Sequence, residues 1–384
     1  MANNNKHTGP NVPALRFPEF SGEWSKDCLN EFLEVQPARN TQGIYSKDDV
    51  LSVSGDYGVV NQIQLLGRSF AGKDVSNYHI VRTNEIVYTK SPLKEFPYGI
   101  VKTNQGTAGI VSTLYAVYSA KSNTNPKFVE YYFSSKERTN KYFKPIVRIG
   151  AKHDMKIGNE EVLRNIVVFP SKQEQNKIQE FLRIIDERIA IQSKIIEEQE
   201  TLLKSLADRM FSENQYSCGL SELVDIVKGK QVNADTLSEE GDYYVMNGGV
   251  APSGYYSEYN VPAGSISISE GGNSCGYVQF NEKPFWSGGH CYSLRAKSDI
   301  VDYKYLYYFL KAKQSDVMAL RIGSGLPNIQ KKDIEKFTVS FPSMVQQLRY
   351  VKVLDAVSDQ LDAEKSILVL YHKQKEHLLS EMFI

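Results

Sequence analysis

The chain has 384 residues, of which 45 are basic and 45 are acidic, so its formal net charge is zero. This length favours two domains over one, and a hydrophobic content of 41% is ordinary for a globular protein. No stretch approaches the roughly 20 apolar residues of a membrane-spanning helix, and the polar start MANNNKHTG is not a signal peptide. The four cysteines lack the spacing of a metal site. We therefore expect a cytoplasmic protein with reduced thiols, no metal and no cofactor.

Positive charge is unevenly distributed along the chain. Residues 85–156 contain twelve basic and five acidic residues, whereas residues 219–342 contain twelve basic and fourteen acidic residues. A local excess of positive charge suits a surface that faces nucleic-acid phosphates. The charge pattern therefore indicates nucleic-acid binding for the first half of the chain only.

The first half of the chain divides into an arm, a mixed segment and a helix. After an N-terminal arm (1–28), the mixed segment (29–170) contains alternating runs such as NEIVYTK (84–90), which predict strands. The run FVEYYF (128–133) predicts a short helix. A Phe-Pro pair ends the segment, and a long helix without glycine or proline is predicted over 171–214.

The second half has the same order of elements. A mixed segment (215–342) contains the strand-like run GSISIS (264–269) and the helical run YLYYFL (305–310). A second Phe-Pro pair precedes a second long helix, predicted over 343–384. Both long helices begin after a serine, so Ser171 and Ser343 are the expected N-caps.

Direct alignment of the two halves reveals an internal repeat. AKSNTNPKFVEYYF (120–133) aligns without a gap on AKSDIVDYKYLYYF (296–309) at a shift of 176 residues. VVFPS (167–171) aligns on VSFPS (339–343) at a shift of 172, and this register holds to the Met-Phe pair that closes each helix. Shifts that drift in loops and stay constant through a helix indicate a divergent duplication.

The two predicted long helices each carry one apolar seam. Apolar residues recur at steps of three, four and seven, the spacing of a coiled coil, over a rod of about 60 Å. The seams are most simply buried against each other in an antiparallel pair. We therefore predict an α+β fold: two tandem mixed α/β domains separated by two long antiparallel coiled-coil-like helices, with a pseudo-twofold internal repeat.

This pattern resembles the specificity subunits of type I restriction–modification enzymes over nearly the whole chain. The resemblance is carried by the opening VPALRFPEFSGEWSKDCLNEF (12–32), by FPSKQEQNKIQEFLRIIDERI (169–189), by its twin FPSMVQQLRYV (341–351) and by GSGLPNIQKKDIEKFTVSFP (323–342). None of these is a catalytic signature. The segment 341–351 differs from the segment 169–189 after Phe-Pro-Ser, so the resemblance defines the docking of partners less well at the second helix.

The resemblance implies a function that composition does not. Such subunits hold two target-recognition domains, here 29–170 and 215–342, each of which contacts one half of a split sequence in double-stranded DNA. The long helices set the spacing of the half-sites, which lie roughly 34–36 Å apart when separated by one DNA turn. Two adenine-N6 methyltransferase subunits dock on the helices and neighbouring domain surfaces, and restriction/translocase subunits join the assembly. The specificity subunit itself has no catalytic residue.

Candidate DNA contacts lie in loops of both mixed segments. In the first, lysines can hold phosphates and amide side chains can pair with adenine; the candidates are Lys90, Lys94, Lys102, Thr103, Asn104 and Gln105. In the second, glycine-rich turns permit close approach to DNA, and the candidates are Asn273, Ser274, His290, Ser324 and Asn328. The alternatives are a solvated surface loop in the first segment and tight turns between strands in the second.

Two other functions compete with this one. A self-contained methyltransferase usually has an Asn/Asp-Pro-Pro-Tyr/Phe loop, and a common nuclease site has Glu-x-Lys; the sequence contains neither Pro-Pro nor Glu-x-Lys. A coiled-coil interaction protein that does not bind DNA is the third interpretation, against which the basic first segment argues.

Overall fold

The computed structural model describes residues 11–93, 95–149, 155–212, 215–323 and 325–384. The chain divides into two compact units, bounded by Met1–Ile191 with Leu368–Ile384 for the first and by Gln192–Ile367 for the second. No helix within the described ranges has the length and apolar character needed to cross a membrane.

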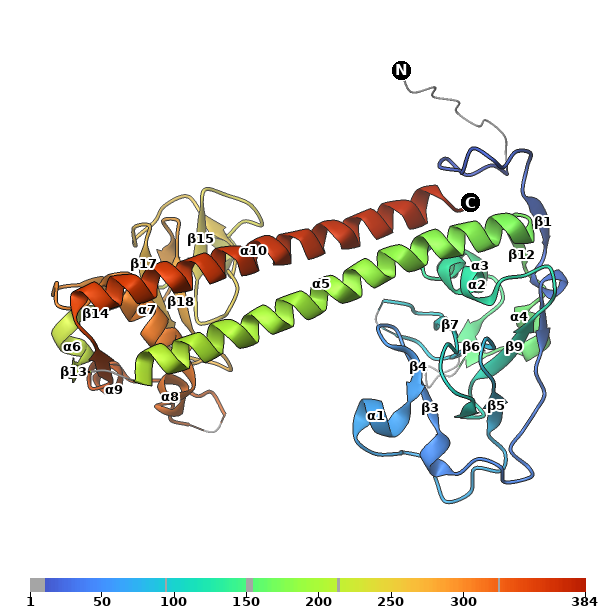
Figure 1. Ribbon diagram of the computed structural model, residues 1–384, viewed down its shortest axis with the longest axis horizontal. Coiled ribbons are helices and arrows are strands. Elements are labelled where there is room, and N and C mark those ends of the chain that lie inside the picture. Colours follow the sequence, from blue (N-terminus) through green and yellow to red (C-terminus); the bar gives the residue numbers. More distant parts are fainter. Residues whose placement is uncertain (1–10, 94, 150–154, 213–214, 324) are drawn as a thin grey trace. The chain divides into compact units, whose positions relative to one another are not determined.

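The first unit combines short strands with helices of one to three turns (Figure 1). Its strands are β1 (Ser25–Cys28), β2 (Leu33–Val35), β3 (Leu51–Ser54), β4 (Gly58–Asn61), β5 (His79–Val81), β6 (Ile86–Tyr88), β7 (Val101–Thr103), β8 (Gly109–Val111), β9 (Ala116–Ala120), β10 (Arg148–Ile149), β11 (Met155–Lys156) and β12 (Ile166–Phe169). Its short helices are η1 (Leu29–Glu31), η2 (Lys47–Asp49), α1 (Gln62–Leu66), α2 (Pro126–Tyr132), α3 (Lys136–Phe143) and α4 (Asn159–Val162).

The second unit has the same mixture of elements. Its strands are β13 (Tyr216–Gly219), β14 (Val224–Lys228), β15 (Tyr243–Met246), β16 (Tyr255–Tyr256), β17 (Ser265–Ser269), β18 (Val278–Asn281), β19 (Trp286–Ser287), β20 (Cys291–Ala296) and β21 (Thr338–Phe341). Its short helices are α6 (Leu220–Leu223), η3 (Ala234–Thr236), α7 (Tyr303–Ala312), α8 (Gln314–Ala319) and α9 (Lys331–Glu335).

Two sheets of each unit have the same topology. Each unit contains a four-stranded antiparallel sheet, in the order β2-β9-β6-β7 in the first and β14-β20-β17-β18 in the second. Each also contains a two-stranded sheet that pairs the first strand with the last, β1 with β12 and β13 with β21. The predicted repeat is therefore present in the strand order as well as in the sequence.

The pairing registers define which residues of the two sheets are equivalent. Ala120 lies opposite Leu33, the first residue of β2, and Ala296 lies opposite Val224, the first residue of β14. Counting back along β9 and β20, Ala116 is equivalent to Tyr292. These pairs fix the correspondence between the two domains independently of sequence similarity.

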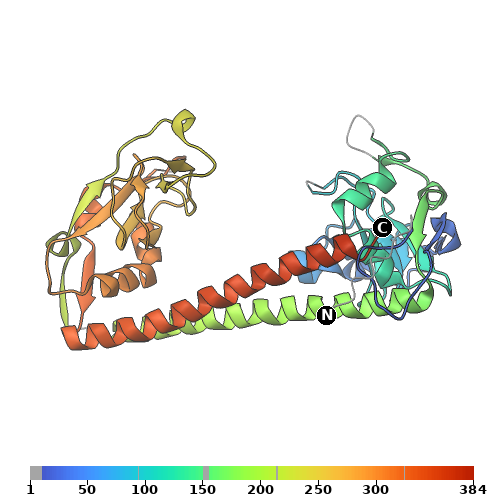
Figure 2. The same cartoon turned by 90° about the horizontal axis from the view of Figure 1, so that it is seen from above.

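The long helices are α5 (Lys172–Ser212) and α10 (Met344–Glu381), as predicted. In the first unit, Asp186 of α5 forms an ion pair with Lys375 of α10 at 2.6 Å, and Ile178 shares the core with Met382. The numbering therefore runs in opposite directions on the two helices, which lie side by side within the unit in both views (Figures 1 and 2). The Ser171 hydroxyl accepts a hydrogen bond from the Glu174 N–H, consistent with an N-cap.

The second unit shows the same antiparallel pairing. Gln192 of α5 donates to the Glu364 carboxylate of α10 at 2.6 Å, whereas Phe211 shares the core with Leu354. An ion pair between Lys365 and a glutamate of α5 adds to this contact at 2.7 Å. Because both compact units contain part of α5 and part of α10, their limits differ from the domain limits expected from the sequence, which remain a prediction.

The Met-Phe pairs that end the long helices fill equivalent positions in the two cores. Phe383 stacks on Phe128 of α2, with ring centroids 5.3 Å apart. Phe211 contacts Tyr305 of α7, also at 5.3 Å, in an edge-to-face arrangement. Phe128 and Tyr305 differ by 177 positions, so the short helices are equivalent at a shift of 177, whereas the gapless sequence alignment placed them at 176.

An N-terminal arm packs against the start of α5 in the first unit. Arg16 makes a bidentate ion pair with Glu174, at 2.7 and 2.8 Å, and both side chains are almost completely buried. The Trp24 indole donates to the same carboxylate at 3.2 Å. The Leu15 N–H donates to the Glu381 carbonyl at 2.9 Å, which ties the arm to the end of α10.

Candidate nucleic-acid interface

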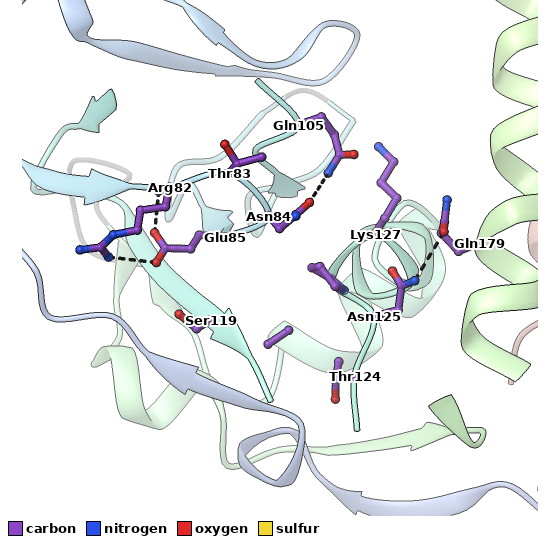
Figure 3. A pocket seen from close by; sticks show the side chains of 12 residues that line it. Arg82, Thr83, Asn84, Glu85, Gln105, Ser119, Thr124, Asn125, Lys127 and Gln179 are labelled. Atoms are coloured by element: carbon purple, nitrogen blue, oxygen red, sulfur yellow. Dashed lines mark hydrogen bonds and ion pairs between the residues drawn. The ribbon is translucent and has the colours of Figure 1, made fainter. Parts of the chain in front are cut away.

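The first unit has a cavity of about 560 Å³ beside the beginning of α2 (Figure 3). Its lining comes from the turn before β6, the end of β9, the start of α2 and one turn of α5. The lining residues are Arg82, Thr83, Asn84, Glu85, Gln105, Ser119, Ala120, Thr124, Asn125, Pro126, Lys127 and Gln179. Most of these side chains are polar, so this first-unit cavity suits hydrogen bonding to phosphates or base edges.

Three side-chain contacts organise the first-unit cavity (Figure 3). Arg82 pairs with Glu85 at 3.2 Å. The Gln105 amide donates to the Asn84 side-chain oxygen at 3.5 Å, and the Asn125 amide donates to the Gln179 side-chain oxygen, also at 3.5 Å. Because the Arg82 side chain is 55% exposed, its guanidinium is accessible to an anionic ligand while it stays close to Glu85.

The predicted contacts at 102–105 differ in accessibility. Gln105 is exposed and lines the first-unit cavity. Thr103 and Asn104 are buried, and their side chains donate to carbonyl oxygens of the same unit. Lys102 is mostly buried and lies 3.6 Å from the Glu130 carboxylate. Burial lowers the pKa of Lys102, and Glu130 partly opposes that shift. Their roles as DNA contacts remain predictions.

Lys90 lies at the opposite end of β6 from the first-unit cavity. Its ammonium group donates to the Asn159 side chain and to the Ile157 carbonyl. Burial lowers the pKa of Lys90. The structure thus gives this lysine an internal partner, and its contact with phosphate remains a prediction. Lys94 lies outside the described residues.

The second unit has a cavity of about 580 Å³ between glycine-rich turns. Its lining residues are Lys228, Asn247, Gly248, Gly249, Ser253, Glu270, Gly271, Gly272, His290, Leu326, Pro327 and Asn328. Gly248 adopts a left-handed conformation with φ of +83°, and an added Cβ there would lie 3.2 Å from the His290 Cβ. Glycine at this position therefore lets the turn approach His290 closely in this glycine-lined cavity.

The structure brings two of the predicted second-domain residues together. His290 and Asn328 both line the glycine-lined cavity, and both are exposed. Asn273 is exposed and Ser274 is half-buried, and they follow directly after Gly271 and Gly272 of the lining. Ser324 lies outside the described residues.

A third cavity, of about 520 Å³, lies in the second unit at the place equivalent to the first-unit cavity. Arg295 and Ala296 line it, and the strand registers make them equivalent to Ser119 and Ala120. Lys228 and Lys230 add positive charge to its lining. Both domains therefore have a polar cavity at the same end of the four-stranded sheet.

Several charged residues of these cavities were not among the sequence-based candidates. Arg82 and Lys127 line the first-unit cavity, and Lys228 and Glu270 line the glycine-lined one. None of them has a spacing typical of a ligand-binding motif, so only the fold shows that each faces a cavity. Among the described residues, no group of three or more His, Cys, Asp or Glu side chains is placed to hold a metal ion.

Comparison with known proteins connects the second half of the chain with a family. The model for the type I restriction modification DNA specificity domain matches residues 216–370. A putative type I specificity subunit of Mycoplasma genitalium is 29% identical over 166 residues, which cover 43% of this chain and 43% of that protein. A type I restriction enzyme specificity subunit of Methanocaldococcus jannaschii is 22% identical over 173 residues, covering 43% and 40%. The match thus spans less than half the length of these relatives.

Solved structures share the fold over almost the whole chain. A crystal structure of a type I restriction–modification system S subunit from M. genitalium superposes with a TM-score of 0.66 at 18% identity, covering 97% of this chain and 99% of that chain. A chain from a study of complex assembly and conformational transition of the type I R-M system has a TM-score of 0.56 at 16% identity, covering 94% and 97%.

Proposed function

Because residues 216–370 match the model for the type I restriction modification DNA specificity domain, we propose that the whole chain is the specificity subunit of such a system. In this role it binds a bipartite target in double-stranded DNA and carries out no catalysis. Each mixed domain recognises one half of the target, and the long helices set the distance between the halves.

The observation that carries this proposal is the duplication of the matched domain. The family match lies in the second half, and the first half repeats its strand order, its short helix and its long helix. Two domains with one architecture and different loop residues suit a target with two different half-sites.

The polar cavities support DNA recognition by both domains. Phosphate contacts from arginine and lysine position a protein on DNA, and side-chain contacts to base edges give specificity. The first-unit cavity has Arg82 and Lys127 beside Gln105 and Asn84. The third cavity has Lys230 and Arg295 at the equivalent place. We propose these basic residues as phosphate contacts of the two half-sites.

We propose two adenine-N6 methyltransferase subunits as the partners on the long helices, with restriction/translocase subunits joining them. Large apolar side chains on these helices are exposed and support such docking: Ile191 is 60% exposed, Val345 is 63% exposed and Leu370 is 62% exposed. Binding of a partner removes these apolar side chains from water, and this burial stabilises the complex.

A selection experiment tests the proposal. The chain is purified in complex with its methyltransferase subunit, incubated with a library of random DNA duplexes, and the bound fraction is sequenced. We expect enrichment of two short sequences at a fixed separation. A complex that binds DNA without enriching any sequence would refute the role in specificity, and a complex that binds no DNA would favour a scaffold unrelated to DNA.

A further inference from the structure

A carboxylate in the second unit is held firmly by one of its oxygens. Glu270, which is 7% exposed, follows β17 and lines the glycine-lined cavity. Its Oε1 accepts hydrogen bonds from the Lys228 ammonium at 2.7 Å and from the Tyr292 hydroxyl at 2.9 Å. Its Oε2 is buried and accepts no hydrogen bond from any described residue. Since a buried acceptor without a donor is costly, Oε2 is poised to accept one.

The imidazole of His290 is the group that lies beside this free oxygen. Its Nδ1 is 3.6 Å from Glu270 Oε2, whereas the side chain as a whole is 63% exposed. The backbone on both sides is fixed: the His290 N–H donates to the Asn247 side chain at 3.1 Å, and the His290 carbonyl accepts from the Glu270 N–H at 2.9 Å. One edge of the ring thus faces a buried carboxylate, and the rest is open to a ligand.

Resting on the function proposed above, we infer that His290 recognises a base of the second half-site and that Glu270 is its positioning residue. A shift of a few tenths of an ångström lets Nδ1–H donate to Oε2. In the neutral ring this donation fixes the tautomer in which Nε2 carries the lone pair. Nε2 then accepts a hydrogen bond from the DNA.

The chemistry of an acceptor selects the class of base. In the major groove, adenine and cytosine present an amino group as a donor, whereas guanine and thymine present acceptor oxygens. His290 with an acceptor Nε2 therefore favours adenine or cytosine at one position of the second half-site. With guanine or thymine at this position, the base oxygen and Nε2 of His290 would face each other as two acceptors without a hydrogen bond.

The Glu270–His290 pair has no counterpart at the equivalent positions of the first domain, as expected for residues that determine which sequence is recognised. Counting outward from the paired strands, Lys90 is equivalent to Glu270 and Leu114 is equivalent to His290. Lys90 is bonded within the first unit, and Leu114 has no hydrogen-bonding side chain. The residues that build the shared scaffold are repeated, whereas this pair is not.

The test is the same selection of random duplexes, repeated with variants of the complex. In Glu270→Gln, the two donors Lys228 and Tyr292 hold the amide oxygen in place of Oε1, so the amide NH₂ takes the place of Oε2. That NH₂ donates to Nδ1 and reverses the tautomer, which makes Nε2 a donor. We expect the preference at one position of the second half-site to change from adenine or cytosine to guanine or thymine, by on the order of tenfold.

His290→Ala provides a second variant at an exposed position, where we expect the substitution to leave folding unchanged. We expect it to lose discrimination at that same position and to retain the first half-site. Glu282→Gln, which changes an exposed carboxylate of the same domain outside the cavity, is the matched control and should retain the full preference.

The outcomes separate this inference from the proposed function. A wild-type complex that selects a bipartite target, together with an unchanged target for Glu270→Gln or His290→Ala, overturns the inference alone. A wild-type preference for guanine or thymine at the affected position also overturns it. A wild-type complex that selects nothing overturns both.

Discussion

Gln175 and Gln347, which lie 172 positions apart, make the same hydrogen bonds in the two units. Both side chains are completely buried. The Gln175 amide oxygen accepts from the backbone N–H of Asn125 at 2.8 Å, and the Gln347 amide oxygen accepts from that of Asp302 at 2.8 Å. Asn125 and Asp302 are the N-caps of α2 and α7, so each glutamine ties a long helix to the short helix of its domain.

The amide nitrogens of the two glutamines are used in the same way. Each donates at 2.9 Å to the carbonyl of the proline before its helix, Pro170 or Pro342. Each also donates to a carbonyl before the N-cap, that of Asn123 at 3.1 Å or of Ile300 at 3.2 Å. The duplicated contacts explain why the Phe-Pro junction and the glutamine five residues after the proline are present in both halves.

We expect Gln175→Leu and Gln347→Leu each to lower the free energy of unfolding by about 1–3 kcal/mol, because each leaves buried backbone groups without partners. The two tryptophans allow each unit to be followed separately, since Trp24 lies in the first unit and Trp286 in the second. Variants that retain only Trp24 or only Trp286 report the unfolding of the first or the second unit. Each glutamine substitution should lower the free energy of unfolding of its own unit only. Gln374→Leu, at an exposed position of α10, is the control and should change little. If Gln374→Leu lowered the free energy of unfolding as much as the other two substitutions, the loss could not be assigned to the hydrogen bonds of Gln175 and Gln347.

Phe383→Ala should destabilise the first unit by about 3–5 kcal/mol, because the ring is 4% exposed and stacks on Phe128. Urea denaturation monitored at Trp24 measures the change. Phe70→Ala removes a ring that is 59% exposed and should have a much smaller effect. If both substitutions gave the same loss, the end of α10 would not be part of this core.

Arg16→Met should destabilise the first unit by about 3–5 kcal/mol, because it leaves the Glu174 carboxylate buried without its cation. Limited proteolysis of the arm gives an independent readout, since release from α5 exposes residues 11–24. Lys177→Met removes an exposed ion pair with Glu19 and serves as the control. An arm that stays protected in Arg16→Met would show that the ion pair does not hold it.

Lys311 gives the second unit a dependence on pH. Burial lowers the pKa of its ammonium group to about 8 in the folded state, against about 10.4 in an unfolded chain. Between these values the unfolded state binds more protons, so this lysine makes stability rise with pH; below about 8 the cost of burying the charge is fully present.

The stability gap between Lys311→Met and the wild type should therefore shift in favour of the wild type as pH rises from 7 to 9.5. Melting temperatures across this range measure the shift. Lys332→Met, at an exposed position of α9, should keep a constant gap to the wild type. A gap for Lys311→Met that is independent of pH would contradict the lowered pKa.

The architecture could be predicted from the sequence because its signals are local. An apolar seam after Phe-Pro-Ser, interrupted in the first helix by Gln192 and Gln199, predicts each long helix, and the strands follow from short alternating runs. The exact register of the repeat could not be obtained in this way. The segment from Ala296 to Asp302 is one residue longer than the segment from Ala120 to Asn125. Because the sequences on both sides of this insertion are similar, a gapless alignment does not detect it.

The candidate site could be predicted less well, because the exposure of a side chain and its hydrogen-bond partners depend on the tertiary structure. Thr103 and Asn104 have side chains suited to DNA, yet the fold buries them. Glu270 carries no signal in the sequence beyond a carboxylate before two glycines. Its relation to His290 follows from the pairing of β17 with β20, which brings together residues 20 positions apart.

Sequencing of methylated adenines in cells that express the chain with its methyltransferase subunit tests the proposed division of labour most directly. We expect a single motif with two defined halves, separated by a spacer of constant length and arbitrary sequence, that disappears when the chain is deleted. A continuous motif without a spacer, or a methylation pattern unchanged by the deletion, would contradict recognition of one half-site by each domain.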